Sequence, residues 1–184
     1  LTNRDEVERM AREVQRRLGP VDILVNNAAG KSANFFEPFE RFSIADWEQV
    51  MSLNVTTAML CSQVIGGAMA VRGRGSIINV ASIYGVVGPD QRIYEGSKYL
   101  GRAINTPAVY SASKAAVLGL TRYLAAYWGD RGVRVNAVTP GGVESGQNDA
   151  FVKRYSLRTP LRRMAKPTEL QGAVVYLASD ASSY

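Results

Sequence analysis

The sequence predicts an α/β fold in which a doubly wound parallel sheet forms a single domain. Short apolar segments typical of strands alternate with amphipathic segments typical of helices from one end to the other. The strand-like segments are almost uniformly apolar, which favours parallel strands covered by helices on both faces. The 184 residues are enough for one domain with a hydrophobic core and too few for two comfortable ones.

The first helix and strand are expected within residues 2–25. Thr2 and Asp5 form a capping-box pattern, and apolar residues follow at helical spacing as far as Leu18. Gly19-Pro20 should end this helix, because glycine favours the helix end and proline cannot continue it. Residues 21–25 are then predicted to form a buried strand.

The second helix and strand are expected within residues 43–81. Ser43 with Asp46 predicts the start of a long helix that continues to about Ala70. The glycines of residues 72–75 turn the chain, and residues 76–81 are predicted to form the next strand.

The rest of the chain begins with a loop-like segment, residues 83–106, which contains several glycines. A helix is predicted over residues 107–128 and a strand over residues 133–138, where Pro140 stops it. A last helix should begin at Pro167, because proline is favoured at the first helical position.

The composition excludes several kinds of site and setting. The chain contains no histidine, which excludes Ser-His and Cys-His mechanisms and most zinc sites, so no metal is expected. Cys61 is the only cysteine, lies in an apolar helical stretch and is expected in the core; its isolation fits a reducing, cytoplasmic setting. No apolar run approaches the length of a membrane span and no secretory leader opens the chain, so no membrane partner is expected.

The net charge of +6 comes from one segment, between Asp149 and Glu169. This basic cluster indicates either a solvated face or an anionic substrate or partner. Nucleic acid is not expected, because no interleaved aromatic platform accompanies the charges. The cluster consists of Lys153, Arg154, Arg158, Arg162, Arg163 and Lys166.

Tyr110 and Lys114 are the most informative pair of residues. Positions i and i+4 share one face of a helix, so the phenol and the ammonium point the same way. A nearby positive charge favours the ionised form of a phenol and makes it a better acid–base catalyst at neutral pH. A surface tyrosine beside a lysine would show the same spacing. Polar residues after the strands, at Asn26-Asn27, Ser82 and Pro140-Gly141, favour the catalytic interpretation because ligands collect at this edge of a parallel sheet.

With these motifs nearly the whole chain resembles the short-chain dehydrogenase/reductase family. Asn26-Asn27-Ala28 is similar to the family's Asn-Asn-Ala-Gly motif, with Ala29 where glycine is usual. Residues 134–145 are similar to the stretch that closes over the nicotinamide, with Ser145 where threonine is commoner. The residues that match the family's catalytic tetrad are Asn54, Ser82, Tyr110 and Lys114.

The resemblance implies a Rossmann-like, NAD(P)-dependent oxidoreductase acting on a secondary alcohol or ketone. Tyr110 would be the general acid and base, Lys114 would favour its ionisation and hold the nicotinamide ribose, and Ser82 would hydrogen-bond the reacting oxygen. Asn54 would hold a water that relays protons to Lys114. The choice between NAD and NADP stays open. The implied cofactor-binding residues are Asn26, Asn27, Ala28, Tyr110, Lys114, Pro140, Gly141, Val143 and Ser145.

Tyr94 and Lys98 form a second Tyr-x-x-x-Lys pair, closer to Ser82 than the first. The glycines and proline between Tyr94 and residue 107 oppose a long helix there, so Tyr110 is preferred. Residues 83–106 are then an insertion at the mouth of the site, either shaping substrate access or forming a plain surface loop.

The resemblance further implies an internal fragment of residues 1–184, truncated at both ends, that lacks the family's glycine-rich phosphate-binding segment and last strand. Gly73-Arg74-Gly75 cannot replace that segment, because it precedes a strand. In relatives the helices corresponding to residues 43–70 and 107–128 build a tetramer interface, so a homo-oligomer, tetramer or dimer, is expected. The alternative is a non-catalytic relative that acts as an oligomerisation or anion-binding module.

Overall fold

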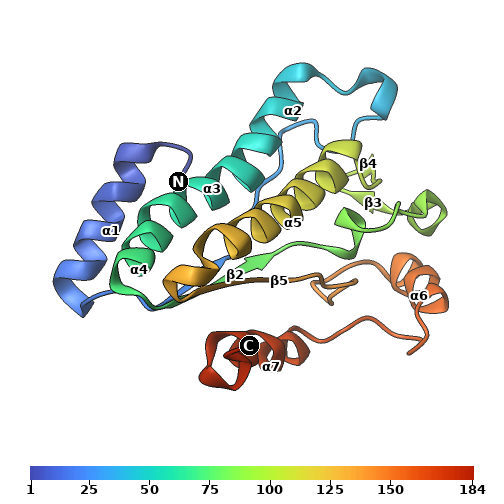
Figure 1. The fold of residues 1–184 in the computed structure, drawn as a ribbon. Coiled ribbons are helices and arrows are strands. Elements are labelled where there is room, and N and C mark those ends of the chain that lie inside the picture. The colour runs from blue at the N-terminus through green and yellow to red at the C-terminus, as the bar shows by residue number, and fades with distance from the viewer.

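The computed structural model describes all residues, 1–184, and its centre is a three-stranded parallel sheet with the order β1-β2-β5. Figure 1 shows helices α1, α3, α4 and α5 on one face of the sheet and α7 on the other, so the predicted doubly wound arrangement is present. The pairing register places Asn26 opposite Asn79, and Asn79 opposite Ala137. The strands are β1 (Ile23–Asn26), β2 (Gly75–Val80) and β5 (Val133–Val138).

The helices agree with the predicted segments except for one. Helix α6 was not predicted, although Asn148 caps it by accepting a hydrogen bond from the Phe151 N–H at 3.0 Å. The helices outside the long second segment are α1 (Arg4–Leu18), α5 (Ala108–Trp128), α6 (Asp149–Arg158) and α7 (Gln171–Ala178), the last preceded by the 3-10 turn η7 (Pro167–Leu170). Shorter 3-10 turns are η1 (Phe39–Arg41), η6 (Gly129–Arg131) and η8 (Asp180–Ser182).

The long helix begins after Ser43, whose hydroxyl accepts a hydrogen bond from the Asp46 N–H at 3.0 Å, as the capping pattern predicts. It runs to Arg72, but two π-helical turns interrupt the α-helical hydrogen bonding. Nothing in the apolar periodicity indicated these turns. Its parts are α2 (Ile44–Met51), η2 (Ser52–Thr56), α3 (Thr57–Cys61), η3 (Ser62–Gly66) and α4 (Gly67–Arg72).

By length and composition alone this helix, Ile44–Arg72, could cross a membrane. The expectation that no apolar run approaches that length is therefore wrong. Half of its most apolar window is buried inside the protein. Leu60 and the predicted core residue Cys61 pack against Val7 of α1, and Met69 belongs to the main core beside the sheet. Packing within the domain accounts for the apolar composition.

Two predictions about the first helix and strand are corrected. The N-cap of α1 is Asn3, whose side chain accepts from the Glu6 N–H at 3.2 Å, so Thr2 lies one residue before the cap. The strand is shifted to β1 and is only half covered. Leu24 packs under α1, whereas Ile23 and Val25 point to the opposite face and remain 48% and 41% exposed.

Residues 83–106 contain more structure than the predicted loop. Two 3-10 turns and a short antiparallel hairpin follow β2, and Ile93 packs with Phe151, Tyr155 and Met164 in a small core against α6. These elements are η4 (Ile83–Gly85), η5 (Gln91–Tyr94), β3 (Lys98–Tyr99) and β4 (Arg102–Ala103).

Candidate active site

A cavity of about 770 Å³ lies beyond the carboxyl ends of the strands, where ligands bind in open parallel sheets. Asn54, Ser82 and Tyr110, three of the four predicted catalytic residues, line it. The loop after β1, the segment after β5, helix α6 and the β3–β4 hairpin complete the wall. Figure 1 shows these segments gathered at one end of the sheet.

Tyr110 lies in the first turn of α5, which begins after Pro107. One turn later Lys114 places its Nζ 5.9 Å from the centre of the Tyr110 ring, so the helical spacing brings the two groups together as predicted. The Lys114 ammonium is buried behind Tyr110 and donates a hydrogen bond to the Val80 carbonyl oxygen at 2.8 Å. Burial lowers the pKa of Lys114.

Ser82 follows β2 and is 6% exposed. Its Oγ accepts a hydrogen bond from the Tyr84 N–H at 3.2 Å and so caps the 3-10 turn η4. Gly85 ends this turn against the backbone of α5. A Cβ added there would lie 2.7 Å from the Lys114 carbonyl carbon. The glycine therefore lets Ser82 approach the helix that carries Tyr110.

Asn54 lies in the π-helical turn η2, a kind of irregularity often found at functional sites. Its Oδ1 accepts from the Gly30 N–H at 2.9 Å, and its Nδ2 donates to Ser113 Oγ at 3.1 Å. Ser113 in turn donates to the Tyr110 carbonyl oxygen at 2.9 Å. Asn54 thus joins the loop after β1 to the first turns of α5.

None of the predicted cofactor residues near β1 lines the cavity. The Asn26 side chain does not line the cavity; its Nδ2 donates to Asn79 Oδ1 at 2.8 Å and to Ser62 Oγ at 3.1 Å, bracing the sheet. Asn27 and Ala28 are also absent from the lining, which this loop supplies instead through its next residues, Ala29 and Gly30.

The predicted cofactor residues after β5 lie closer to the cavity. Gly141, Val143 and Ser145 line it, whereas Pro140 uses its carbonyl oxygen to accept a hydrogen bond from the Ile83 N–H at 3.1 Å. This bond continues the β2–β5 pairing past the ends of the strands and fixes the segment after β5 beside Ser82.

The rival pair Tyr94 and Lys98 is not on a helix. Tyr94 ends η5 and Lys98 begins β3, although both residues line the cavity. The Tyr94 hydroxyl lies 2.5 Å from Thr106 Oγ1, and burial raises the pKa of Tyr94. This tyrosine is therefore held as a neutral phenol, without the ammonium that accompanies Tyr110.

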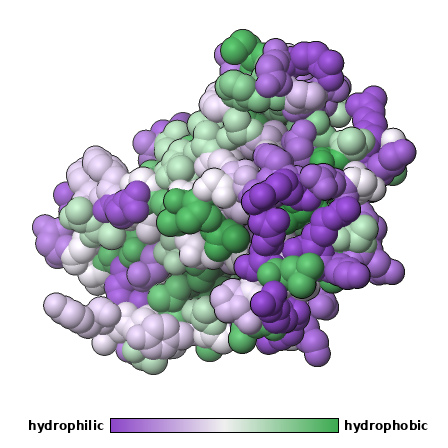
Figure 2. Space-filling view, turned by 90° about the vertical axis from the view of Figure 1, so that its right-hand side faces the viewer, coloured by the Kyte–Doolittle hydropathy of each residue, from purple (hydrophilic) through white to green (hydrophobic).

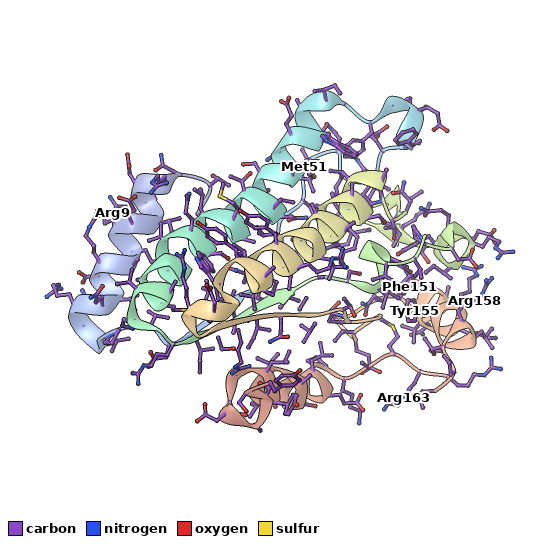
Figure 3. All side chains as sticks on the ribbon, viewed as in Figure 1. Arg9, Met51, Phe151, Tyr155, Arg158 and Arg163 are labelled. Atoms are coloured by element: carbon purple, nitrogen blue, oxygen red, sulfur yellow. The ribbon has the colours of Figure 1, made fainter.

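Several aromatic residues of the cavity were not predicted from the sequence. Burial and the neighbouring phenols of Tyr94 and Tyr155 raise the pKa of Tyr84, which keeps it neutral. Phe151 and Tyr155 reach the cavity from α6, and Tyr155 accepts a hydrogen bond from the Gly142 N–H. In Figure 3 both lie on the side of α6 toward the strand ends. The Asn148 cap and the i, i+4 spacing of Phe151 and Tyr155 are the signals that could have revealed them.

None of the six residues of the basic cluster lines the cavity. Arg158 pairs with Asp90, Arg154 donates to the Glu95 carbonyl oxygen, and Arg163 pairs with Glu169 at 2.5 Å. Arg163 hydrogen-bonds the Glu169 carboxylate and lowers its pKa to about 2. Arg158 and Arg163 lie away from the sheet in Figure 3, so these contacts favour the solvated-face interpretation of the cluster.

Comparison with known proteins identifies the family. A family model described as enoyl-(acyl carrier protein) reductase matches residues 1–184. The crystal structure of a short chain dehydrogenase from Leptospira borgpetersenii serovar Hardjo-bovis with bound NAD+ is 35% identical, with a TM-score of 0.88 over 100% of this chain and 67% of that chain. The chain belongs to the short-chain dehydrogenase/reductase family. The resemblance in sequence and the Rossmann-like α/β fold are thereby confirmed.

Other short-chain dehydrogenase/reductase proteins agree. Nodulation protein G of Azospirillum brasilense is 36% identical over 181 residues, which are 95% of this chain and 65% of the relative. The crystal structure of a gluconate 5-dehydrogenase from Burkholderia cenocepacia J2315, in complex with NADP and tartrate, is 30% identical with a TM-score of 0.84, over 99% of this chain and 67% of that one. The chain thus spans about two thirds of the length of these relatives.

Proposed function

We propose that the protein is an NAD(P)-dependent oxidoreductase that transfers a hydride between a nicotinamide cofactor and a secondary alcohol or ketone. The observation that carries the proposal is the pairing of Tyr110 with a buried ammonium, 5.9 Å from its ring, in a cavity that Ser82 also lines. Relatives whose structures contain NAD+ or NADP support the cofactor. The non-catalytic alternative is not favoured.

Each residue of the site has a defined task in this proposal. In reduction, the Tyr110 hydroxyl gives a proton to the substrate oxygen; in oxidation, the phenolate takes that proton. Ser82 donates a hydrogen bond to the same oxygen and stabilises the negative charge that develops on it. The Lys114 ammonium lies beside the Tyr110 ring and stabilises the negative charge that develops on the phenol oxygen as the proton is transferred; its field is strong because it is shielded from water. When bound, the nicotinamide supplies or accepts the hydride.

The residues around the cavity fit the nicotinamide end of such a cofactor. Ala29, Gly30, Gly141 and Gly142 give walls with little or no side chain, against which a flat ring can lie. The Ser145 hydroxyl is exposed beside Val143 and offers a hydrogen-bonding group for a carboxamide. Tyr110 and Lys114 would hold the ribose. Asn26 would act indirectly, by bracing the end of β1.

The proposed substrate is a small alcohol or ketone, as the activities named for relatives suggest. We further propose a cytoplasmic homo-oligomer, for which the free, buried Cys61 and the exposed, stacked pair Tyr123 and Tyr127 on α5 are consistent features. Whether the oligomer is a dimer or a tetramer is decided by light scattering on the purified protein.

Turnover of the nicotinamide cofactor tests the proposal. The full-length protein is incubated with NADH or NADPH and a panel of small hydroxylated ketones, and the loss of reduced nicotinamide absorbance is followed. We expect ketone-dependent oxidation of at least one cofactor, with Ser82→Ala slowing it by roughly 10²–10³-fold. A protein that binds the cofactor but turns over no alcohol or ketone in either direction would instead be the non-catalytic relative.

A further inference from the structure

The charged residues of the cavity wall are all positive. Lys31, from the loop after β1, and Lys98, from the hairpin, are its only charged lining residues, and no carboxylate lines it. All ion pairs of the protein are formed by arginines, so neither lysine is neutralised by a carboxylate within 4.0 Å. Figure 2 shows hydrophilic groups mixed with hydrophobic ones on the side of the molecule that carries the hairpin and α6.

Lys31 is held in place by aromatic rings. Its Nζ lies 5.7 Å from the centre of the Phe35 ring, 5.2 Å from Phe36 and 5.5 Å from Tyr99. Such cation–π contacts orient an ammonium, and Lys31 is exposed, so its Nζ can also donate to an anion. Phe35 also packs edge-on against Tyr110, with the ring centres 6.5 Å apart, so one ring lies between the ammonium and the proposed acid–base group.

Lys98, unlike Lys31, lines a second cavity together with carboxylates. The volume of this neighbouring cavity is about 790 Å³, and its carboxylates are those of Glu37, Glu40 and Glu95. None of these carboxylates forms an ion pair with it. Lys98 therefore adds positive charge to the wall, but the nearby carboxylates oppose its field, and Lys31 should dominate.

The rest of this wall includes amide, hydroxyl and phenol side chains, which can hydrogen-bond the hydroxyl groups of a ligand. These residues are Tyr94, Asn105, Thr106, Gln147 and Asn148. Some of their capacity is already used within the protein, because Tyr94 bonds Thr106, Asn105 donates to the Phe36 carbonyl oxygen and Asn148 caps α6.

We propose that Lys31, assisted by Lys98, binds an anionic group on a polyhydroxylated ketone or alcohol, and so determines substrate class. This rests on the proposed function for the identity of the reaction, but the anion site itself is a binding property. A carboxylate or a phosphate on the substrate would supply the same charge-assisted hydrogen bonds. The basic cluster between Asp149 and Glu169, for which an anionic substrate or partner was one of two interpretations, does not line this cavity.

Calorimetric binding of three matched polyols to the full chain tests this. D-gluconate and D-glucitol share a carbon skeleton and differ by one carboxylate, and D-glucitol 6-phosphate carries the phosphate instead. We expect the preferred anion to bind about tenfold more tightly than D-glucitol, the gain of one charge-assisted hydrogen bond. Raising the ionic strength should reduce the preference, because salt screens the lysines. The two anions distinguish a sugar-acid site from a sugar-phosphate site.

Matched variants decide whether the lysines are responsible. Lys31→Gln should remove most of the anion preference and Lys98→Gln a smaller part. Lys31→Arg, which keeps the charge and the stacking, should retain it, and Lys153→Gln, exposed on α6, should change nothing. Equal binding of all three polyols, or an anion preference that survives in both Gln variants, would overturn the proposal. Because binding is the readout, a failure of nicotinamide turnover would refute the proposed function without affecting this test.

Discussion

Lys114 carries a buried ammonium whose hydrogen-bond partner is one carbonyl oxygen, that of Val80. Burial lowers its pKa below the value of about 10.4 expected in the unfolded chain. Between the folded and unfolded pKa values, the unfolded state binds more protons than the folded state, so the contribution of Lys114 to the free energy of unfolding rises with pH. Below the folded pKa this contribution is most unfavourable. Burial of the Lys114 ammonium therefore destabilises the folded state and places a positive charge beside Tyr110.

Replacing Lys114 by Met should therefore separate activity from stability. We expect turnover to fall by about 100-fold or more, because the positive charge beside the proposed acid–base group is lost. The free energy of unfolding at neutral pH, measured with urea, should stay the same or increase, and its difference from wild type should shrink toward pH ~10. Lys153→Met is the exposed control and should alter neither quantity. A loss of more than about 1 kcal/mol in Lys114→Met would mean that the lysine stabilises the fold.

Residues whose positions follow from local spacing could be predicted from the sequence, whereas residues placed by contacts with distant parts of the chain could not. Tyr110 and Lys114 lie on one face of α5 because of their i, i+4 spacing, which is visible in the sequence. The position of Asn26 in the sheet, instead of the cavity wall, depends on its pairing partner Asn79, far along the chain. The contact of Lys31 with Tyr99 of the hairpin likewise joins residues that are far apart in the chain.

At the scale of elements, the turn η4 depends on close contact with α5. Gly85→Ala would place a Cβ 2.7 Å from the Lys114 carbonyl carbon and push the turn away from the helix. We expect a loss of about 1–3 kcal/mol in the free energy of unfolding, as for other overpacked sites. Turnover should also fall, because Ser82 begins the displaced turn. Gly88→Ala is the control, since a Cβ there meets nothing within 4 Å. Equal stability and activity of the two variants would contradict this account of the turn.

Most elements were predictable, because capping residues and apolar periodicity are local signals. Residues 133–138 form the predicted strand, and α5 begins within a residue of its predicted start. The π-helical turn that presents Asn54 left no local signal, and the partners of Asn54, Gly30 and Ser113, lie on other elements. Helix α6 was not predicted, although the Asn148 cap and the i, i+4 spacing of Phe151 and Tyr155 are local signals for it.

In the whole molecule, the strand order β1-β2-β5 determines where the candidate site lies. The loops after β1, β2 and β5 reach the same edge of the sheet, and each supplies residues to one cavity. Residues 83–106 pack onto α6 through Ile93 and the Asp90–Arg158 pair, so they form part of the cavity wall. That these residues are an insertion that shapes substrate access remains a prediction.

Paired Tyr→Phe replacements decide whether Tyr110 or Tyr94 is the acid–base group. The full-length protein and the variants Tyr110→Phe and Tyr94→Phe are compared in nicotinamide-coupled turnover of one ketone. We expect a loss of roughly 10²–10⁴-fold for Tyr110→Phe, the usual contribution of general acid–base catalysis. For Tyr94→Phe we expect at most a modest change. Activity that survives in Tyr110→Phe and disappears in Tyr94→Phe would make Tyr94 the acid–base group instead.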